Sequence, residues 1–268
     1  MFGGVYLRRH LSRRTDSLVS TPPGPSHRRG LRARYVRRVT AEHIGERVSV
    51  RRWVDDPERG LVQGDVVGRL LAYGDDAMLL VDRRRQLHVV DPARVTSSRV
   101  VPPHPRLEDE PGLPSRNAPL ERRAARVLLL DERGRVLLVS HLPGGGRRVW
   151  TAPGGGLQPD EDHLTAARRE LVEELGVEVD PGPCIWQRSV TFSFHGVWLC
   201  QHERWHLVRA ELDARQAPLV DVAIDEARWW SLRELETTDE HLAPRRLPEL
   251  LAALLREGPP DEPLDVGA

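Results

Sequence analysis

The amino-acid sequence predicts an α+β protein with two domains, and three observations support this fold class. Short β-prone runs follow one another about every ten residues between Arg47 and Val101, as in a small antiparallel sheet. Six prolines then fall between Pro102 and Pro119, in a segment too polar to form a core. Beyond that segment, strand and helix patterns mix without the strict βαβ order of parallel α/β folds. The 268 residues suffice for two such domains.

Basic and acidic side chains balance over the whole chain but not along it. Forty basic residues, all arginine, stand against forty acidic residues, which excludes a polycationic nucleic-acid binder and an acidic solvating chain. Residues 1–40 nevertheless carry ten arginines and one acid. We expect a disordered basic tail there, in a bacterial protein with the codon bias of a GC-rich genome. An overextended start, a transit peptide and electrostatic contact with nucleic acid are the alternatives.

Cysteine content and hydropathy bear on where the protein works. Cys184 and Cys200 are the only cysteines, and their spacing fits neither a disulfide framework nor a four-ligand zinc motif. We therefore expect a reducing, cytoplasmic setting. No apolar run approaches the length of about 18 residues that a membrane helix needs, so the sequence predicts no membrane span.

The first domain is predicted over residues 41–103, after the basic tail. Its expected strands are Arg47–Val54, Asp65–Tyr73, Ala77–Asp82, Gln86–Val90 and Ser98–Val101. Turn residues such as Asp91-Pro92 separate these runs. The stretch from Val90 to Val95 resembles the short helical turn of SH3-like barrels, and the whole segment resembles the SH3-like domain ahead of some actinobacterial acetyltransferases. This resemblance implies a small β-barrel.

A proline-rich linker at 104–117 leads to a second domain at 118–258, and residues 259–268 are expected to form a tail. Gly134 lies where a hairpin turn needs a positive φ, and Gly176 lies where a helix needs a left-handed cap. Strands are expected at Ala125–Leu130, Arg135–Ser140, near Trp150, and at Ile185–Thr191, Val197–Leu212 and Ala227–Ser231. Helices are expected at His163–Leu175 and Leu247–Arg256.

The helix expected at His163–Leu175 carries three carboxylates close together. At 100° per residue, Glu170, Glu173 and Glu174 share an arc of about 100°. The neighbouring arc is apolar and would pack on a sheet; its residues are Leu164, Ala167, Leu171 and Leu175. Clustered like charges destabilise a helix unless solvent or a cation screens them. A solvated acidic face is one interpretation, and a site for Mg²⁺ or Mn²⁺, which prefer oxygen ligands, is the other.

The surrounding residues favour the metal site. The 23 residues from Gly155 to Val177 fit the pattern GX5EX7REUXEEXGU, where U is aliphatic, at every fixed position. The seven fixed residues would occur by chance at about 10⁻⁸ per starting position, given about 6 to 8% usage of each. This is the signature of the Nudix hydrolases, and the chain resembles that family from about Arg123 to Gly258.

The resemblance implies a mixed β-sheet between helices, and it implies roles for individual residues. Glu170, Glu173 and Glu174 would hold divalent metal, with a backbone carbonyl of Gly154 or Gly155. Arg169 and Glu161 would form an ion pair that orients them. Independently of the resemblance, glycine at Gly154 to Gly156 lets the backbone approach a phosphate and a metal closely.

The general base and the groups that bind the nucleobase are left open by the sequence. A metal-activated water needs a base, and an acid on a later loop or strand could serve. The candidates are Glu226, which we rank first, Asp225 and Glu203, besides the helix glutamates. Trp150 could stack on a nucleobase, whereas Trp229 and Trp230 are expected in the core and at its rim.

The predicted function is Mg²⁺-dependent hydrolysis of a nucleoside diphosphate linked to a further group. Companion motifs for ADP-ribose, dinucleoside polyphosphates, NADH or coenzyme A are not evident, so a nucleoside triphosphate, ordinary or modified, is the expected substrate. The alternative is a non-catalytic module that senses nucleotides or binds nucleic acid or protein through its two domains. Degenerate signatures typify such modules, and this signature is intact.

Overall fold

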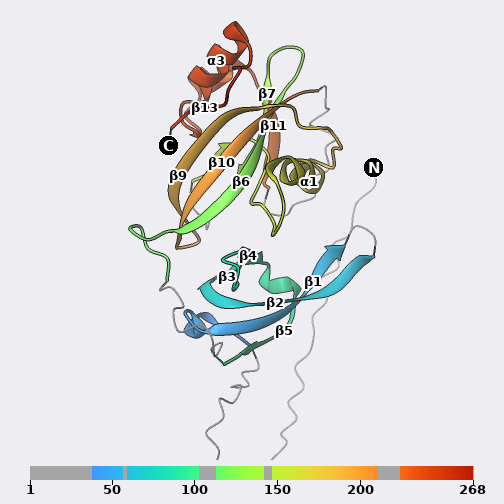
Figure 1. Cartoon of the computed structure of the whole chain (residues 1–268), viewed down its shortest axis with the longest axis vertical. Coiled ribbons are helices and arrows are strands. Elements are labelled where there is room, and N and C mark those ends of the chain that lie inside the picture. The colour runs from blue at the N-terminus through green and yellow to red at the C-terminus, as the bar shows by residue number, and fades with distance from the viewer. Residues whose placement is uncertain (1–37, 57–58, 103–112, 142–146, 211–223, 268) are drawn as a thin grey trace, which may run out of the picture. The chain divides into compact units, whose positions relative to one another are not determined.

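The computed structural model describes residues 38–56, 59–102, 113–141, 147–210 and 224–267 (Figure 1). The predicted basic tail up to residue 37, most of the predicted linker, and the glycines 144–146 lie outside the described residues. No helix among the described residues has both the length and the apolar character needed to cross a membrane.

The first sheet has five antiparallel strands in the order β4-β3-β2-β1-β5. Its strands are β1 (Arg47–Asp56), β2 (Gly60–Tyr73), β3 (Met78–Val81), β4 (Leu87–Val90) and β5 (Val95–Val100). All five predicted strands are therefore present. A 3-10 turn, η1 (Ala41–His43), precedes β1, and another, η2 (Pro92–Arg94), lies between β4 and β5, where a helical turn was predicted.

Apolar side chains on one face of this sheet form a core of their own. Val48, Val50, Leu70, Leu80 and Val90 are fully buried within it. The last strand, β5, returns to pair with the first, so both β1 and β2 have a partner on each side. Only β4 and β5 are left as edges of this sheet.

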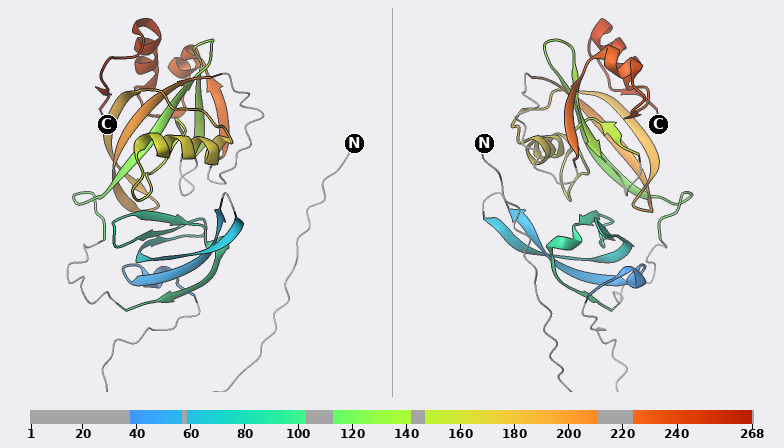
Figure 2. Two further views of the ribbon diagram at one scale, coloured as in Figure 1. Left: turned by 45° about the vertical axis from the view of Figure 1, so that its right-hand side comes forward. Right: turned by 180° about the vertical axis from the view of Figure 1, so that it is seen from behind.

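The second sheet is mixed, as predicted for an α+β fold. Its strands are β6 (Leu120–Leu130), β7 (Val136–His141), β8 (Val149–Thr151), β9 (Cys184–Phe194), β10 (Val197–Arg209), β11 (Glu226–Trp230), β12 (His241–Ala243) and β13 (Leu264–Asp265). The order is β12-β8-β7-β6-β10-β9-β13, with β11 paired to β7. Strands β6 and β10 run parallel, and β9 and β10 form a long antiparallel hairpin that curls across the domain (Figure 2).

Helices cover both faces of the second sheet (Figures 1 and 2). They are α1 (His163–Leu175), α2 (Leu232–Thr237) and α3 (Leu247–Glu257). Side chains alternate along β6, so Val127 and Leu129 pack in the core beneath α1, while Leu128 and Leu130 pack in the core beneath α3. The predicted layering of a mixed sheet between helices is confirmed.

The structure differs from the sequence-based expectation in three short elements. Helix α2 and strand β12 were not predicted, because neither is long enough to show a periodic pattern. Residues 259–268 were expected to form a tail, but β13 pairs with β9 there and Val266 is buried in the core beneath α3. Leu164 was placed on the apolar stripe of α1, yet it is 39% exposed.

Candidate active site

The loop before α1 is held along the edge of β6. The N–H groups of Ala125 and Val127 donate to the carbonyls of Gly155 and Pro153, at 3.0 and 2.8 Å, and Leu157 N–H donates to the carbonyl of Arg123. β7 pairs with β6 only at Leu129 and Leu130. The earlier part of that edge is therefore free to receive the glycine loop, which fixes the loop's backbone relative to the sheet.

Helix α1 begins and ends where the sequence predicts. The carboxylate of Asp162 accepts the N–H of Thr165 at 2.7 Å and caps the first turn. Gly176 closes the helix with φ 64°, a left-handed conformation that favours glycine. Gly154 in the preceding loop has φ 134°, and a Cβ there would overlap the backbone of Ala125. Both ends of the helix are thus set by local sequence.

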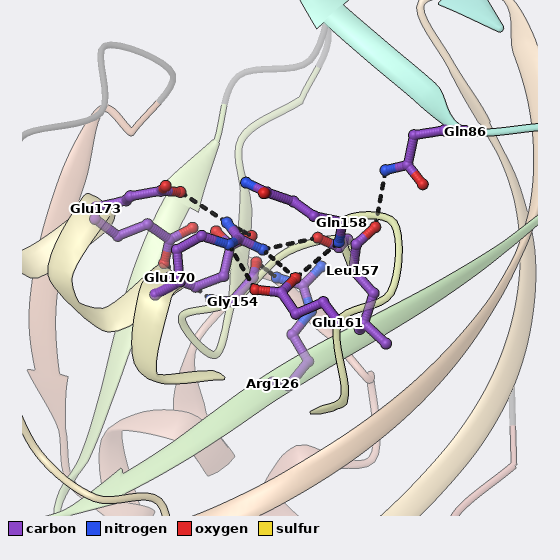
Figure 3. A network of polar contacts seen from close by, with 11 residues as sticks. Gln86, Arg126, Gly154, Leu157, Gln158, Glu161, Glu170 and Glu173 are labelled. Carbon is purple, nitrogen blue, oxygen red and sulfur yellow. Dashed lines mark hydrogen bonds and ion pairs between the residues drawn. The ribbon is translucent and has the colours of Figure 1, made fainter. Parts of the chain in front are cut away.

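Arg169 joins the loop to the acidic face of the helix. Its guanidinium donates two hydrogen bonds to Glu161, at 2.9 and 3.0 Å, and one each to Glu170 and Glu173, both at 2.8 Å (Figure 3). It also donates to the carbonyl of Gly156 at 3.0 Å. Burial alone would lower the pKa of Arg169, but these carboxylates raise it, so the group stays charged. The structure therefore brings together the predicted Arg169–Glu161 pair.

The three helix carboxylates differ in their surroundings. Glu173 is half exposed, whereas Glu170 and Glu174 are largely buried. Glu174 accepts the N–H of Gly154 at 2.9 Å. Burial, with the nearby charge of Glu173, raises the pKa of Glu170 above its ordinary value, while Arg169 opposes that shift. A Cβ on Gly155 would overlap the Glu170 carboxylate, so glycine is needed for this close approach.

These carboxylates and the loop backbone form a donor set made only of oxygen. Glu170 lies against Gly155, and Glu174 lies against Gly154. Oxygen-rich sites with several carboxylates suit hard divalent cations. The residues present thus fit the divalent metal that the sequence analysis predicted at Glu170, Glu173, Glu174 and Gly155.

Two arginines of β6 that the sequence analysis missed lie beside the loop. Arg126 donates to the carbonyl of Gly154 at 2.6 Å and to that of Ala152 at 3.2 Å (Figure 3). The guanidinium of Arg122 packs against Gly156, where a Cβ would overlap it. Their separation by four residues in a strand puts both on one face. That spacing, with Arg122 and Arg126 on the same face of the strand as the buried Leu128 and Leu130, is the signal that could have identified them.

Arg122 differs from Arg126 in having no hydrogen bond or ion pair with any residue that the structure describes. Burial, together with repulsion from Arg126, lowers the pKa of Arg122 to about 10, so it remains charged at neutral pH. The charges of Glu170 and Glu203 offset part of the cost of burying this guanidinium, but no hydrogen bond from a described residue replaces its lost hydration. An anionic ligand beside Gly156 would supply the missing partner.

Glu203 on β10 is the charge that anchors this group of arginines. Its carboxylate accepts hydrogen bonds from Arg188 at 2.5 Å, Gln201 at 2.7 Å and Trp205 at 2.9 Å, and from Arg126 at 3.4 Å. Burial would raise the pKa of Glu203, but Arg126 and Arg188 outweigh it and lower the pKa to about 2. A general base works best with a pKa near the working pH, so Glu203 suits an anchoring role better than a basic one.

The other two later acids lie on a different strand. Asp225 and Glu226, at the start of β11, form ion pairs with Arg148 at 2.6 and 3.3 Å. Both carboxylates are about half exposed. Glu226 pairs with Ser140 of β7 across the sheet. Among the described residues, no hydrogen bond joins Glu226 to Glu170, Glu173 or Glu174.

Trp150 does not lie where stacking on a nucleobase requires it. Its ring is 2% exposed and packs edge-on against Trp230, with 5.0 Å between ring centroids. Both rings belong to the core beneath α3. The stacking expected from the sequence is therefore corrected: Trp150 is a core residue, because its position in β8 turns the ring toward α3. Trp230 in the core and Trp229 at its margin agree with the prediction.

Comparisons with known proteins concern the second domain. The family described as NUDIX domain matches residues 120–252. An RNA pyrophosphohydrolase from Pseudomonas putida is 27% identical over 147 residues, which cover 48% of this chain and 91% of the relative. One from Dinoroseobacter shibae is 44% identical over 63 residues, 22% of this chain and 36% of the relative. A solved MutT protein from Methanosarcina mazei Go1 has 22% identity and a TM-score of 0.42, covering 55% of this chain and 100% of that one.

Replacing Glu203 by glutamine should destabilise the fold at neutral pH by about 3 kcal/mol, because two buried arginines lose their counter-charge. The pKa of Glu203 is about 2 in the folded protein, below its ordinary value of 4.5. Its ionisation therefore stabilises the fold above about pH 4.5, and this stabilisation is lost as the pH falls toward 2. The difference in free energy of unfolding between wild type and Glu203→Gln, measured by urea unfolding, should therefore narrow as the pH falls from about 4.5 toward 2. Glu226→Gln, at a half-exposed site, is the control, and its free energy of unfolding should stay close to that of wild type. Equal stability of the two variants at pH 7 would contradict the anchoring role of Glu203.

Proposed function

Residues 120–252 belong to the NUDIX domain family of pyrophosphohydrolases, and we propose that the chain uses this domain to hydrolyse a nucleoside diphosphate linked to a further group, with a nucleoside triphosphate as substrate. One observation carries the proposal. The acids gathered by Arg169 and the unpaired guanidinium of Arg122 lie on either side of the same three-glycine loop. Cation-binding and anion-binding groups so close together suit a metal–diphosphate substrate.

Glu170, Glu173 and Glu174, with the backbone carbonyl of Gly155, would hold Mg²⁺ or Mn²⁺. The carbonyl of Gly155 already accepts the N–H of Ala125 and keeps a second lone pair. When bound, the divalent cations would neutralise phosphate oxygens and lower the pKa of the attacking water. Gly154 and Gly156 have no side chain of their own, so Glu174 and the Arg122 guanidinium can lie directly against the loop backbone where the phosphates would bind, which is the role proposed for these glycines.

Arg169 and Glu161 would preserve the geometry while the carboxylates exchange partners. Glu161 holds the guanidinium through two parallel hydrogen bonds, so Arg169 stays in place when Glu170 and Glu173 turn to a cation. A proton must leave the attacking water, and Glu226 remains our first candidate to accept it. Its half-exposed carboxylate is paired only through Arg148 among the described residues. Glu203 would act indirectly, by positioning Arg126.

Arg122 would bind the phosphate next to the cleaved linkage. Its guanidinium offers five N–H donors, and no described residue takes them. Arg126 is already engaged with Gly154, Ala152 and Glu203, so it would add charge more than direct contact. The burial that lowers the pKa of Arg122 strengthens its interaction with an anion, because less water screens the charge.

The first domain and the surroundings of the enzyme form the rest of the proposal. The order β4-β3-β2-β1-β5, with η2 between β4 and β5, supports an SH3-like barrel at 41–103. We place the enzyme in the cytoplasm, where its nucleotide substrates occur. Contact of the basic segment 1–40 with nucleic acid would then be electrostatic and weak.

An assay that measures the release of phosphate or pyrophosphate from a panel of nucleotides tests the substrate class. With Mg²⁺ present, nucleoside triphosphates should be hydrolysed with higher kcat/KM than ADP-ribose. The relatives named RNA pyrophosphohydrolase favour a second candidate, the 5′-triphosphate end of an RNA. Faster hydrolysis of a 5′-triphosphorylated oligonucleotide than of any free nucleotide would replace the first candidate by the second. If none of these substrates is hydrolysed, the alternative of a non-catalytic module that senses nucleotides or binds nucleic acid or protein would be favoured.

Glu174→Gln tests the acidic face. Glutamine keeps an oxygen that can accept the N–H of Gly154 but loses the charge, so the rate should fall by about 10² to 10⁴ while the fold survives. The rise of Tm on adding Mg²⁺ should shrink in the same variant. The exposed Glu178→Gln, just beyond the helix, is the matched control and should keep both properties. Full activity in Glu174→Gln would exclude the assigned role.

Arg122→Gln tests the phosphate contact. Loss of one charged donor should lower kcat/KM by about 10- to 100-fold. The free energy of unfolding should stay constant or rise, because the burial of Arg122 and its repulsion from Arg126 outweigh the attraction of Glu170 and Glu203. Arg123→Gln removes the same charge from the opposite face of β6 and should leave kcat/KM within about twofold. If both variants lose activity equally, net charge and not a specific contact is responsible.

A further inference from the structure

A second cluster of potential metal ligands lies outside the candidate active site. Glu121 of β6 stands directly across from Cys200 in the neighbouring parallel strand β10, and His202 follows two residues later on the same face. The carboxylate Oε2 of Glu121 is 2.6 Å from Nε2 of His202, and Sγ of Cys200 is 3.9 Å from the same nitrogen. The three donor atoms all lie within 4.8 Å of one another. Three chemically different donors thus converge on one point.

The imidazole of His202 is oriented by a residue of a third strand. Its Nδ1 lies 2.8 Å from the hydroxyl of Ser189, which stands across from His202 in β9. With Nδ1 held there, Nε2 points toward Glu121 and Cys200. Histidines that bind metals commonly have their second ring nitrogen fixed in this way, which sets the tautomer and the direction of the free lone pair.

Hydrogen bonds now occupy the positions that a cation would take. The imidazole of His202 and the thiol of Cys200 both lie beside the single carboxylate of Glu121. A cysteine thiol ordinarily keeps its proton at neutral pH, and one nitrogen of a neutral imidazole carries a proton as well. A divalent cation would displace these protons and leave thiolate, neutral imidazole and carboxylate facing it.

We propose that Glu121, Cys200 and His202 bind one Zn²⁺ ion, with water as the fourth ligand. Sulfur, nitrogen and one oxygen suit zinc, whereas the all-oxygen acids of α1 suit Mg²⁺. Zinc bonds of about 2.0 Å to nitrogen and oxygen and about 2.3 Å to sulfur require ligand atoms about 3.3 to 3.7 Å apart in a tetrahedron. The present 2.6 and 3.9 Å lie within side-chain adjustment of those values. The ion would join β6 to β10.

Metal titration of the full-length, tag-free protein in excess Mg²⁺ tests this site. Wild type should bind one equivalent of Zn²⁺, and Co²⁺ in its place should give a thiolate-to-cobalt charge-transfer band. Cys200→Ser should abolish the band, while Cys184→Ser, which alters the chain's other cysteine, should keep it. Ser189→Ala should weaken zinc binding about tenfold, since it only orients His202.

Two further variants test whether a loss of zinc binding reflects misfolding, or whether the zinc binds instead to the acids of α1. Glu121→Gln alters an exposed side chain and should weaken zinc binding without lowering the Tm of the metal-free protein. Glu174→Gln should bind the zinc equivalent normally. Cobalt binding without a thiolate band, a band that survives Cys200→Ser, or unchanged affinity in Glu121→Gln would each overturn the proposal.

Discussion

The guanidinium of Arg169 is the constraint on which the site is built. Five hydrogen bonds from this one group fix Glu161, Glu170, Glu173 and the carbonyl of Gly156 around a common centre. Without such a cation, three acids on adjacent turns would repel one another and weaken α1. Because Glu161 precedes the helix and Gly156 belongs to the loop, the same group also ties loop to helix. Under the proposed function, Arg169 would therefore serve both the folding of α1 and the positioning of the metal ligands.

A second charge network, around Glu203 of β10, complements the first. Glu203 neutralises part of the charge of Arg126 and Arg188, and Arg126 in turn holds the loop carbonyl at Gly154. Arg122 is left over, next to Gly156. The acids of α1 and the arginines of β6 thus meet at the glycine loop from opposite sides. A protein that hydrolyses metal-bound phosphates needs both signs of charge at that point.

Sequence reasoning predicted the elements whose signals are local and missed those set by distant packing. The bounds of α1 follow from the Asp162 cap and from Gly176, so that helix could be placed residue by residue. Trp150 was misjudged because a three-residue strand does not reveal which face of the sheet its ring will join. β13 forms only by pairing with β9, and no local sequence pattern predicts that contact. The roles of Arg122 and Arg126 depend on their contacts with the glycine loop, which lies about 30 residues further along the chain and which the local sequence of β6 does not reveal.

The parallel pairing of β6 with β10 has a consequence for synthesis. Leu120 finds its partner in Leu199, so the ribosome must extend the chain through the glycine loop, α1 and β9 before β6 can be enclosed. Until then β6, whose last four residues are all fully buried in the native state, offers a bare apolar edge to other nascent chains. The second domain is thus vulnerable to aggregation for as long as translation between these two strands lasts. Slow synthesis through this interval would lengthen its need for a chaperone.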